Sequence, residues 1–511
     1  MPSVSQAVLL SWSVPPAASF ALALTALIYL RGWFLLRRAR VPFVPGWRAV
    51  SFVLGILTLW IALASPLDAF SSFIITAHML QHMLLMMVAP PLILLGAPLI
   101  PLVRGLPIFA AREFAGPFLN WPWAKRVGAA LTNLYVALIL MGLAMFAWHT
   151  PRLYELALQS SSWHELEHTC FFLASLIFWW PVVQPWPSRP QASRWAVVPY
   201  LLIGDVQNTI LSAILVFSDR VLYPSYAEMP RLFGFSALHD QAASGAIMWV
   251  MGSVPFLVPA MLISVQCLSK NMPRVDVPPR HDANGVFAWL RGRPATFSYA
   301  SLPQKFGAYR FQAITFVVLF AAAGLVLAAL ASGSSDDDDQ ALRMRSNSGP
   351  FAIAVFAAQG DLEAGPNSFA VLVQNRQTQE VLQDATVEIR ARQIGSERET
   401  NTVRAGVENS ENNLLQSADL ELPAPGDWSL LISVRDASDS AEFALPLRVV
   451  QPDHGFTLHW PYLVLLAFGA VLLLVYIRRH HASKTVTRHP AAVATEADVQ
   501  ADELELTRKS R

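Results

Sequence analysis

The 511-residue sequence has little charge and almost no cysteine. Only 14% of its residues are charged, against roughly a quarter in an average soluble domain, and 54% are hydrophobic. Lys and Arg number 37 and Asp and Glu 36, so no basic excess favours binding to nucleic acid. The two cysteines, Cys170 and Cys267, lie far apart in apolar stretches, which excludes a disulfide framework and a cysteine-based zinc finger. This is the composition of a membrane protein, in which a bound metal would need ligands other than cysteine.

Long apolar runs recur along the chain. A helix needs roughly 20 apolar residues to cross a bilayer core of about 30 Å. We predict nine such spans, near 14–35, 49–66, 78–99, 128–148, 167–183, 197–217, 242–264, 311–332 and 458–477. The fold class expected is an all-α polytopic membrane bundle of about eight spans, with a ninth near the C-terminus. The first span lacks the basic start and cleavage site of a signal peptide, so we expect it to be kept as an anchor.

Basic residues are concentrated in alternate loops. Loops 31–48, 101–127, 184–196 and 265–310 hold 18 basic and three acidic residues, whereas the segments between them hold three basic residues and, besides Asp205, seven acidic residues. Cytoplasmic loops of membrane proteins are enriched in Lys and Arg. The pattern therefore predicts a multi-pass protein of the bacterial inner (plasma) membrane, with a periplasmic N-terminus and a cytoplasmic C-terminus.

A polar segment separates the last two predicted spans. Within it, short alternating stretches such as 368–374 and 385–391 are broken by Gly and Pro turns, which is typical of a small β-sandwich. The predicted organisation is a multi-span membrane domain over 1–332, a periplasmic β-sandwich-like domain over 333–457, a C-terminal transmembrane helix over 458–477 and a disordered cytoplasmic tail over 478–511.

Histidines gather on one side of the predicted membrane. Five lie at or near the outer ends of three spans: His78, His82, His149, His164 and His168. Two pairs have i,i+4 spacing, so each pair projects from one helix face and can chelate one ion. A single histidine at a membrane interface is ordinary, but two chelating pairs beside a fifth imidazole indicate a metal site. Neutral imidazole suits copper, zinc, iron and nickel and does not choose among them.

Methionine makes copper the favoured metal. Met79 and Met83 lie beside His78 and His82, and thioether together with imidazole favours Cu(I). Methionine is also a common filler of apolar helices, so its presence alone does not establish a ligand. Asp205 lies inside a predicted span, where an ionisable group indicates either a functional site or a hydrogen-bonded packing element.

Two other metal-dependent roles fit the same histidines. The string His164-Glu165-Leu166-Glu167-His168 satisfies the H-E-x-x-H pattern of zinc proteases, with Glu165 as general base. More imidazoles lie here than one catalytic zinc uses. Histidines from two different helices also suit axial ligation of haem. A membrane zinc metalloprotease and a haem-binding membrane protein therefore remain as less favoured alternatives.

Five motifs follow one another in the sequence between about 45 and 265. They are His78-x3-His82-Met with Ala89-Pro-Pro-Leu-x-Leu-Leu-Gly-Ala-Pro98, then Trp148-His149-x-Pro151-x-x-Tyr154, His164-x3-His168, Leu222-Tyr-Pro-x-Tyr226, and Asp240-Gln241-x3-Gly245-x-x-Met248-Trp249. Together they resemble the polytopic CtaG-type cytochrome c oxidase assembly family, which implies a role in assembling a haem-copper oxidase or delivering copper to it. The 333–457 segment more weakly resembles YtkA-like or FixH-like domains. It has no His, Met or Cys between 346 and 453, so we expect it to act as a docking or scaffold module.

The sequence thus leads us to expect a non-enzymatic cytochrome c oxidase assembly factor that handles copper at the periplasmic face. The five histidines would be the metal ligands, with Met79 and Met83 as soft ligands. Asp240 would orient an imidazole or organise its loop, with Gln241 beside it. The expected partners are haem-copper oxidase subunits, other copper chaperones and membrane lipid, with no nucleic acid. A copper transporter using the same histidines is the main alternative.

Overall fold

The computed structural model describes most of residues 11–269 and 340–451. The undescribed positions inside these ranges are 13, 42–43, 112–121, 186–187, 189–191, 233–234, 359–361, 397, 408–411 and 437–438. The predicted spans at 311–332 and 458–477 and the predicted tail lie outside the described residues, so the total span count and the ninth, tethering span remain predictions.

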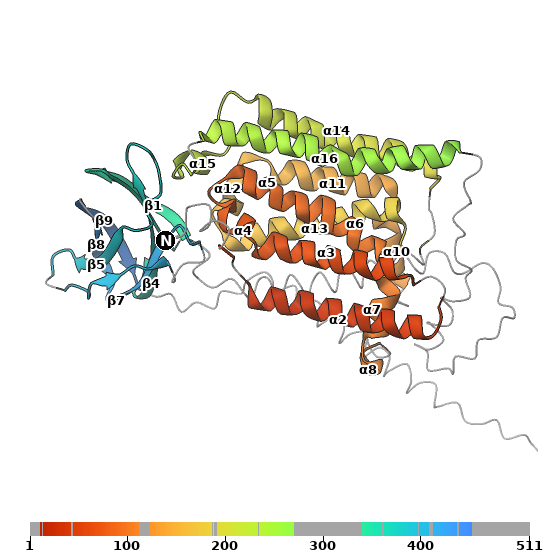
Figure 1. The fold of residues 1–511 in the computed structure, drawn as a ribbon, viewed down its shortest axis with the longest axis horizontal. Helices are drawn as coiled ribbons and strands as arrows, with labels where there is room; N and C mark the ends of the chain where they lie inside the picture. Colours follow the sequence, from red (N-terminus) through yellow and green to blue (C-terminus); the bar gives the residue numbers. More distant parts are fainter. Residues whose placement is uncertain are drawn as a thin grey trace, which may run out of the picture. The chain divides into compact units, whose positions relative to one another are not determined.

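Six of the described helices are long and apolar enough to cross a membrane (Figure 1). They are α2 (Pro16–Arg38), α3 (Gly46–Ala64), the continuous run of α5 (Ile75–Met83), η1 (Leu84–Val88) and α6 (Ala89–Leu95), α13 (Ser161–Val183), α14 (Arg194–Phe217) and α16 (Ala237–Leu268). Each coincides with a predicted span. The chain is therefore a multi-pass membrane protein, as the apolar runs predict.

The predicted span at 128–148 is broken in the structure. It begins later, at α11 (Leu134–Trp148), because Asn133 accepts a hydrogen bond from the backbone N–H of Tyr135 and starts a new helix after α10 (Pro122–Leu131). At its far end α11 meets α12 (Pro151–Leu158) at a bend of 70°. Pro151 stands at the first position of α12, where a missing N–H is tolerated. The bend leaves His149 at the corner between the two helices.

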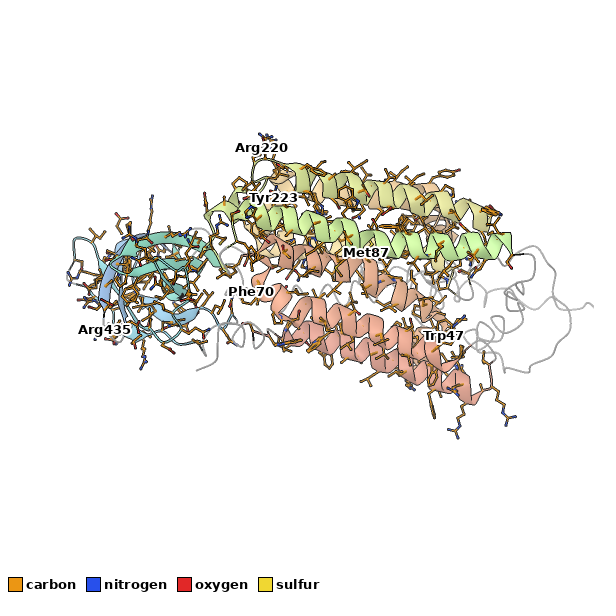
Figure 2. All side chains as sticks on the ribbon, turned by 45° about the horizontal axis from the view of Figure 1, so that its top comes forward. Trp47, Phe70, Met87, Arg220, Tyr223 and Arg435 are labelled. Carbon is orange, nitrogen blue, oxygen red and sulfur yellow. The ribbon has the colours of Figure 1, made fainter. Side chains whose placement is uncertain are left out.

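Short helices complete the bundle. They are α4 (Pro66–Ser71), α7 (Leu99–Gly105), α8 (Ile108–Ala110) and α15 (Pro224–Glu228). Figure 2 shows Trp47, at the start of α3, at one end of the bundle and Arg220 and Tyr223 at the other.

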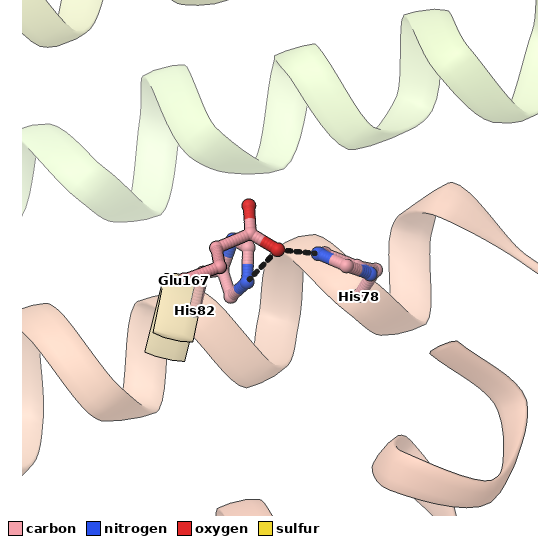
Figure 3. A group of neighbouring side chains, drawn as sticks. All are labelled: His78, His82 and Glu167. Atoms are coloured by element: carbon pink, nitrogen blue, oxygen red, sulfur yellow. Dashed lines mark ion pairs between the residues drawn. The ribbon is translucent and has the colours of Figure 1, made fainter. Parts of the chain in front are cut away.

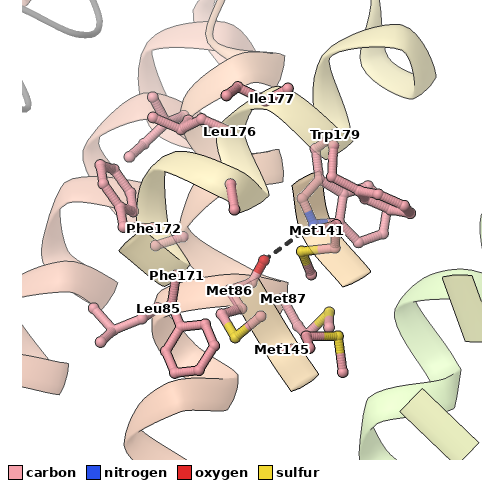
Figure 4. Packing of buried hydrophobic residues seen from close by; sticks show 14 of the residues in the cluster. Leu85, Met86, Met87, Met141, Met145, Phe171, Phe172, Leu176, Ile177 and Trp179 are labelled. Carbon is pink, nitrogen blue, oxygen red and sulfur yellow. Dashed lines mark hydrogen bonds between the residues drawn. The ribbon is translucent and has the colours of Figure 1, made fainter. Parts of the chain in front are cut away.

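A π-helical turn interrupts the helix that carries His78 and His82. Pro90 has no N–H, so the Met86 carbonyl four residues earlier loses its helical partner. The hydroxyl of Ser175 and the indole N–H of Trp179 on α13 donate to that carbonyl instead, the latter at 3.0 Å (Figure 4). Within η1, the Ala89 N–H donates to the Leu84 carbonyl, five residues back. This exchange of a helical bond for two contacts from α13 ties the two histidine-bearing helices together.

The C-terminal part of the described chain is a two-sheet β domain. The strands are β1 (Gln340–Ser348), β2 (Phe351–Ala358), β3 (Leu362–Glu363), β4 (Gly365–Asn375), β5 (Thr386–Gln393), β6 (Val403–Arg404), β7 (Gln416–Leu422), β8 (Gly426–Arg435) and β9 (Ser440–Val450). One sheet has the order β1-β2-β4-β7 and the other β3-β9-β8-β5-β6, with β3 and β9 parallel and the other neighbours antiparallel.

The two sheets share one hydrophobic core. Phe369 and Val371 of β4 belong to the same buried cluster as Val387 of β5 and Trp428 of β8. Buried and partly exposed residues alternate along β8, the pattern of a strand with one face inward. The alternating stretches at 368–374 and 385–391 are thus strands β4 and β5, as predicted.

Candidate metal centre

His78 and His82 lie on one face of α5 and are both buried, with 0% and 3% of their surface exposed. Their spacing of four residues places the rings one turn apart, where they meet edge-to-face with ring centres 4.2 Å from each other. The carboxylate of Asp240, on α16, accepts hydrogen bonds from the backbone N–H groups of Ile75 (2.7 Å) and Thr76 (3.2 Å). It therefore caps the N-terminus of α5 and positions the first turn before His78.

Glu167 of α13 completes a group with these two histidines (Figure 3). Its Oε2 atom is 3.6 Å from Nε2 of His78 and 4.0 Å from Nε2 of His82, and its side chain is fully buried. One ligand atom from each of the three residues lies within 4.8 Å of the others. Two imidazoles and a carboxylate form a ligand set used by zinc and other transition metals.

The remaining three predicted histidines surround this group. The ring centre of His164 is 5.2 Å from that of His78, and the ring centre of His168 is 5.2 Å from that of His82. His149 lies 6.4 Å from His82 by the same measure. The structure therefore brings all five predicted histidines, from α5, the α11–α12 corner and α13, into one cluster.

Most side-chain polar atoms of this cluster have no hydrogen-bond partner among the described residues. Among the described residues, none donates or accepts a hydrogen bond at the buried Nε2 atoms of the five histidines or at either carboxylate oxygen of Glu167. Leaving a buried polar atom unpaired costs about 1–3 kcal/mol, so six such groups side by side indicate a site built for a ligand. Nitrogen and oxygen atoms converging from three helices fit a metal cation.

Hydrogen bonds at the opposite ring nitrogens orient two of the imidazoles. Nδ1 of His149 is 2.8 Å from the Met145 carbonyl, which can only accept, so Nδ1 carries the proton and Nε2 keeps its lone pair. Tyr226 donates its single proton to the Ser71 carbonyl at 2.6 Å, so its oxygen faces Nδ1 of His78, 3.4 Å away, as an acceptor. Both histidines therefore present unprotonated Nε2 atoms, the form that binds a metal.

Buried tyrosines line the side of the cluster next to α15. The Tyr154 ring stacks on Tyr223 with centres 3.8 Å apart, and its hydroxyl is 3.5 Å from that of Tyr226. Burial raises the pKa of the Tyr226 hydroxyl well above its usual range, so Tyr226 stays a neutral donor. Tyr223 donates to the His149 carbonyl at 3.2 Å. These rings shield the imidazoles from water.

The other predicted site residues lie at different distances from the histidines. Met79 is buried and Met83 half-buried, both packed with the core of the bundle, and their role as ligands remains a prediction. The contacts of Asp240 favour the second of its two predicted roles, since it organises the start of α5. Gln241 accepts from the Leu222 N–H at 2.7 Å and so secures the segment that follows α14. Asp205 on α14 has no hydrogen bond or ion pair to the cluster histidines among the described residues.

No role for Glu167 follows from the sequence patterns alone. A signal was present, because Glu167 is three residues after His164 and thus on the same side of α13, inside a segment apolar enough to span a membrane. The H-E-x-x-H pattern instead predicts a role for Glu165, as the general base. Of the two acids, Glu167 is the one whose carboxylate reaches His78 and His82 in the described structure.

Comparison with known proteins agrees with the helical part of this description. Residues 27–270, a little under half of the chain, match the family model of the cytochrome c oxidase caa3 assembly factor, Caa3_CtaG. The chain is also similar to an uncharacterized protein of Mycobacterium leprae, 28% identical over 47% of this chain and 36% of that protein, and to one of Mycobacterium bovis, 24% identical over 51% and 40%. The chain thus spans well under half the length of these relatives. No solved structure matches the chain.

Proposed function

We propose that this protein is a cytochrome c oxidase assembly factor that holds copper at the cluster of His78, His82, His149, His164, His168 and Glu167. The family match supports the assembly role. The observation that carries the copper role is the set of buried, unpartnered Nε2 atoms facing a buried carboxylate. The protein would act without catalytic turnover, with oxidase subunits and other copper chaperones as partners.

The chemistry of the cluster fits a copper ion. Imidazole binds copper, zinc and iron, and the thioethers of Met79 and Met83, which adjoin His78 and His82 in the sequence, would shift the preference towards Cu(I). An anionic Glu167 offsets the positive charge of the ion, and this attraction is stronger in a dry interior than in water. Copper is also the metal that a haem-copper oxidase must receive.

The charge pattern supports the proposed location. The 18 basic residues of the alternate loops favour a cytoplasmic position for those loops. The histidines lie towards the other ends of the helices, so the cluster would open to the periplasmic side of a bacterial inner membrane, and the β domain would lie on that side too. From there copper could pass to an oxidase subunit.

Copper binding and oxidase activity together test this function. The purified protein should bind Cu(I) in preference to Zn(II), and His78→Ala or His82→Ala should lose that binding and lower oxidase activity in membranes, normalised to the amount of this protein. His239→Ala is the matched control, because His239 is exposed at the start of α16 and lies outside the cluster. Normal copper binding and normal oxidase activity in both His78→Ala and His82→Ala would rule the proposal out.

The main alternative, a copper transporter, makes a different prediction for the same site. A transporter would move copper across the membrane of sealed vesicles, and the His78→Ala variant would abolish that flux. An assembly factor would bind copper without moving it across. A zinc protease would need Glu165, and Glu165→Gln would then abolish function.

A further inference from the structure

The cluster contains a second chelating pair beside the first group. His164 and His168 are one turn apart on α13, and their ring centres are separated by 4.2 Å, the same distance as for His78 and His82. The two pairs face each other across α5 and α13, with 5.2 Å between His78 and His164 and 5.2 Å between His82 and His168. The four rings thus form two adjacent chelating pairs.

The second pair does not share the ligand positions of the first group. A metal–nitrogen bond is about 2.0–2.1 Å long, so two nitrogens on one ion lie at most about 4 Å apart. His78, His82 and Glu167 approach this closeness, with ligand atoms within 4.8 Å of one another. No other set of three His, Cys, Asp or Glu residues does so within the part of the chain that the structure describes. His164 and His168 therefore lie outside that ligand set.

The second pair is nevertheless built like a ligand site. His168 exposes only 7% of its surface, and the Nε2 atoms of both His164 and His168 are buried without a hydrogen-bond partner among the described residues. Two imidazoles at i,i+4 are a chelating arrangement in their own right.

We infer that His164 and His168 form a second Cu(I) position, so that the cluster holds two copper ions per chain. The inference rests on the proposed copper function and adds the number of ions and the residues of the second one. The first ion is held by His78, His82 and Glu167. Six ligand groups exceed the roughly four that a tetrahedral ion uses, which agrees with two positions.

Anaerobic titration of the full-length, detergent-purified protein with Cu(I), against a coloured Cu(I) chelator, tests the inference. The wild-type chain should bind two equivalents. The double variant His164→Ala/His168→Ala should bind one, and the control His239→Ala should still bind two. Gel filtration and circular dichroism establish that each variant is folded. If the double variant does not accumulate, the wild-type stoichiometry still tests whether the chain binds two copper ions.

The outcomes separate this inference from the proposed function. No copper in the wild-type chain would overturn both. One equivalent in the wild-type chain would overturn the second position and leave the copper function intact. Two equivalents that persist in a folded His164→Ala/His168→Ala variant would overturn the assignment of the second ion to these residues.

Discussion

Replacement of Glu167 by Gln separates its role as a ligand from any role in packing. The two side chains have nearly the same shape, so the buried site keeps its volume. The change removes the negative charge that lies 3.6 Å from Nε2 of His78 and 4.0 Å from Nε2 of His82. Glu167 is fully buried and neither of its oxygens has a hydrogen-bond partner among the described residues, so an ionised form has little to stabilise it without a cation.

This geometry predicts a large effect on metal affinity and little effect on the stability of the metal-free protein. Even groups that only support a metal ligand contribute about 10–100-fold to affinity. Loss of a direct carboxylate contact should therefore weaken copper binding by at least this factor, about 1.4–2.7 kcal/mol. The metal-free protein should unfold at about the same temperature as the wild type, because a buried carboxyl without a cation is held mainly in its neutral form, which Gln matches in shape and charge.

Competition titration with Cu(I) and thermal unfolding of the metal-free protein measure the two effects. Glu165→Gln is the matched control, since it lies two positions away on α13 and outside the set of His78, His82 and Glu167. We expect Glu165→Gln to bind copper normally and to retain most oxidase activity. The reasoning would be refuted if Glu167→Gln bound copper as tightly as the wild type. Selective loss of function in Glu165→Gln would instead support a hydrolytic enzyme.

Three further outcomes follow from the fold and the charge pattern. Ser175→Ala removes one of two donors to the carbonyl that Pro90 leaves free, so thermal unfolding in detergent should report a loss of about 1 kcal/mol; an unchanged midpoint would contradict this. The isolated segment 340–450 should fold alone around its own core, with its one tryptophan shielded from quenchers, and micromolar copper binding by it would contradict a scaffold role. Single cysteines placed in 150–163 should react with a membrane-impermeant reagent in intact cells and those in 270–300 should not; the reverse would invert the topology.

Local patterns in the sequence were sufficient to predict the spanning helices and the two histidine pairs. Each spanning helix satisfies its own backbone hydrogen bonds, so an apolar run of sufficient length predicts it without knowledge of its neighbours. The i,i+4 spacing of His78 and His82 likewise determines that both rings share one helix face. The alternating residues of β4 and β5 indicated strands for the same reason, because a strand turns successive side chains to opposite faces.

Only the tertiary structure decided which helix faces meet. The contact of Glu167 with His78 and His82 depends on the packing of α13 against α5 and η1, which no spacing within one helix specifies. The same packing supplies the Met86 carbonyl with donors from Ser175 and Trp179. Helical periodicity determines the direction of a side chain relative to its own helix, whereas a metal centre needs directions that converge between helices. That convergence is set by side-chain packing between distant segments, so the sequence predicted the histidines that cluster and the folded bundle added the carboxylate.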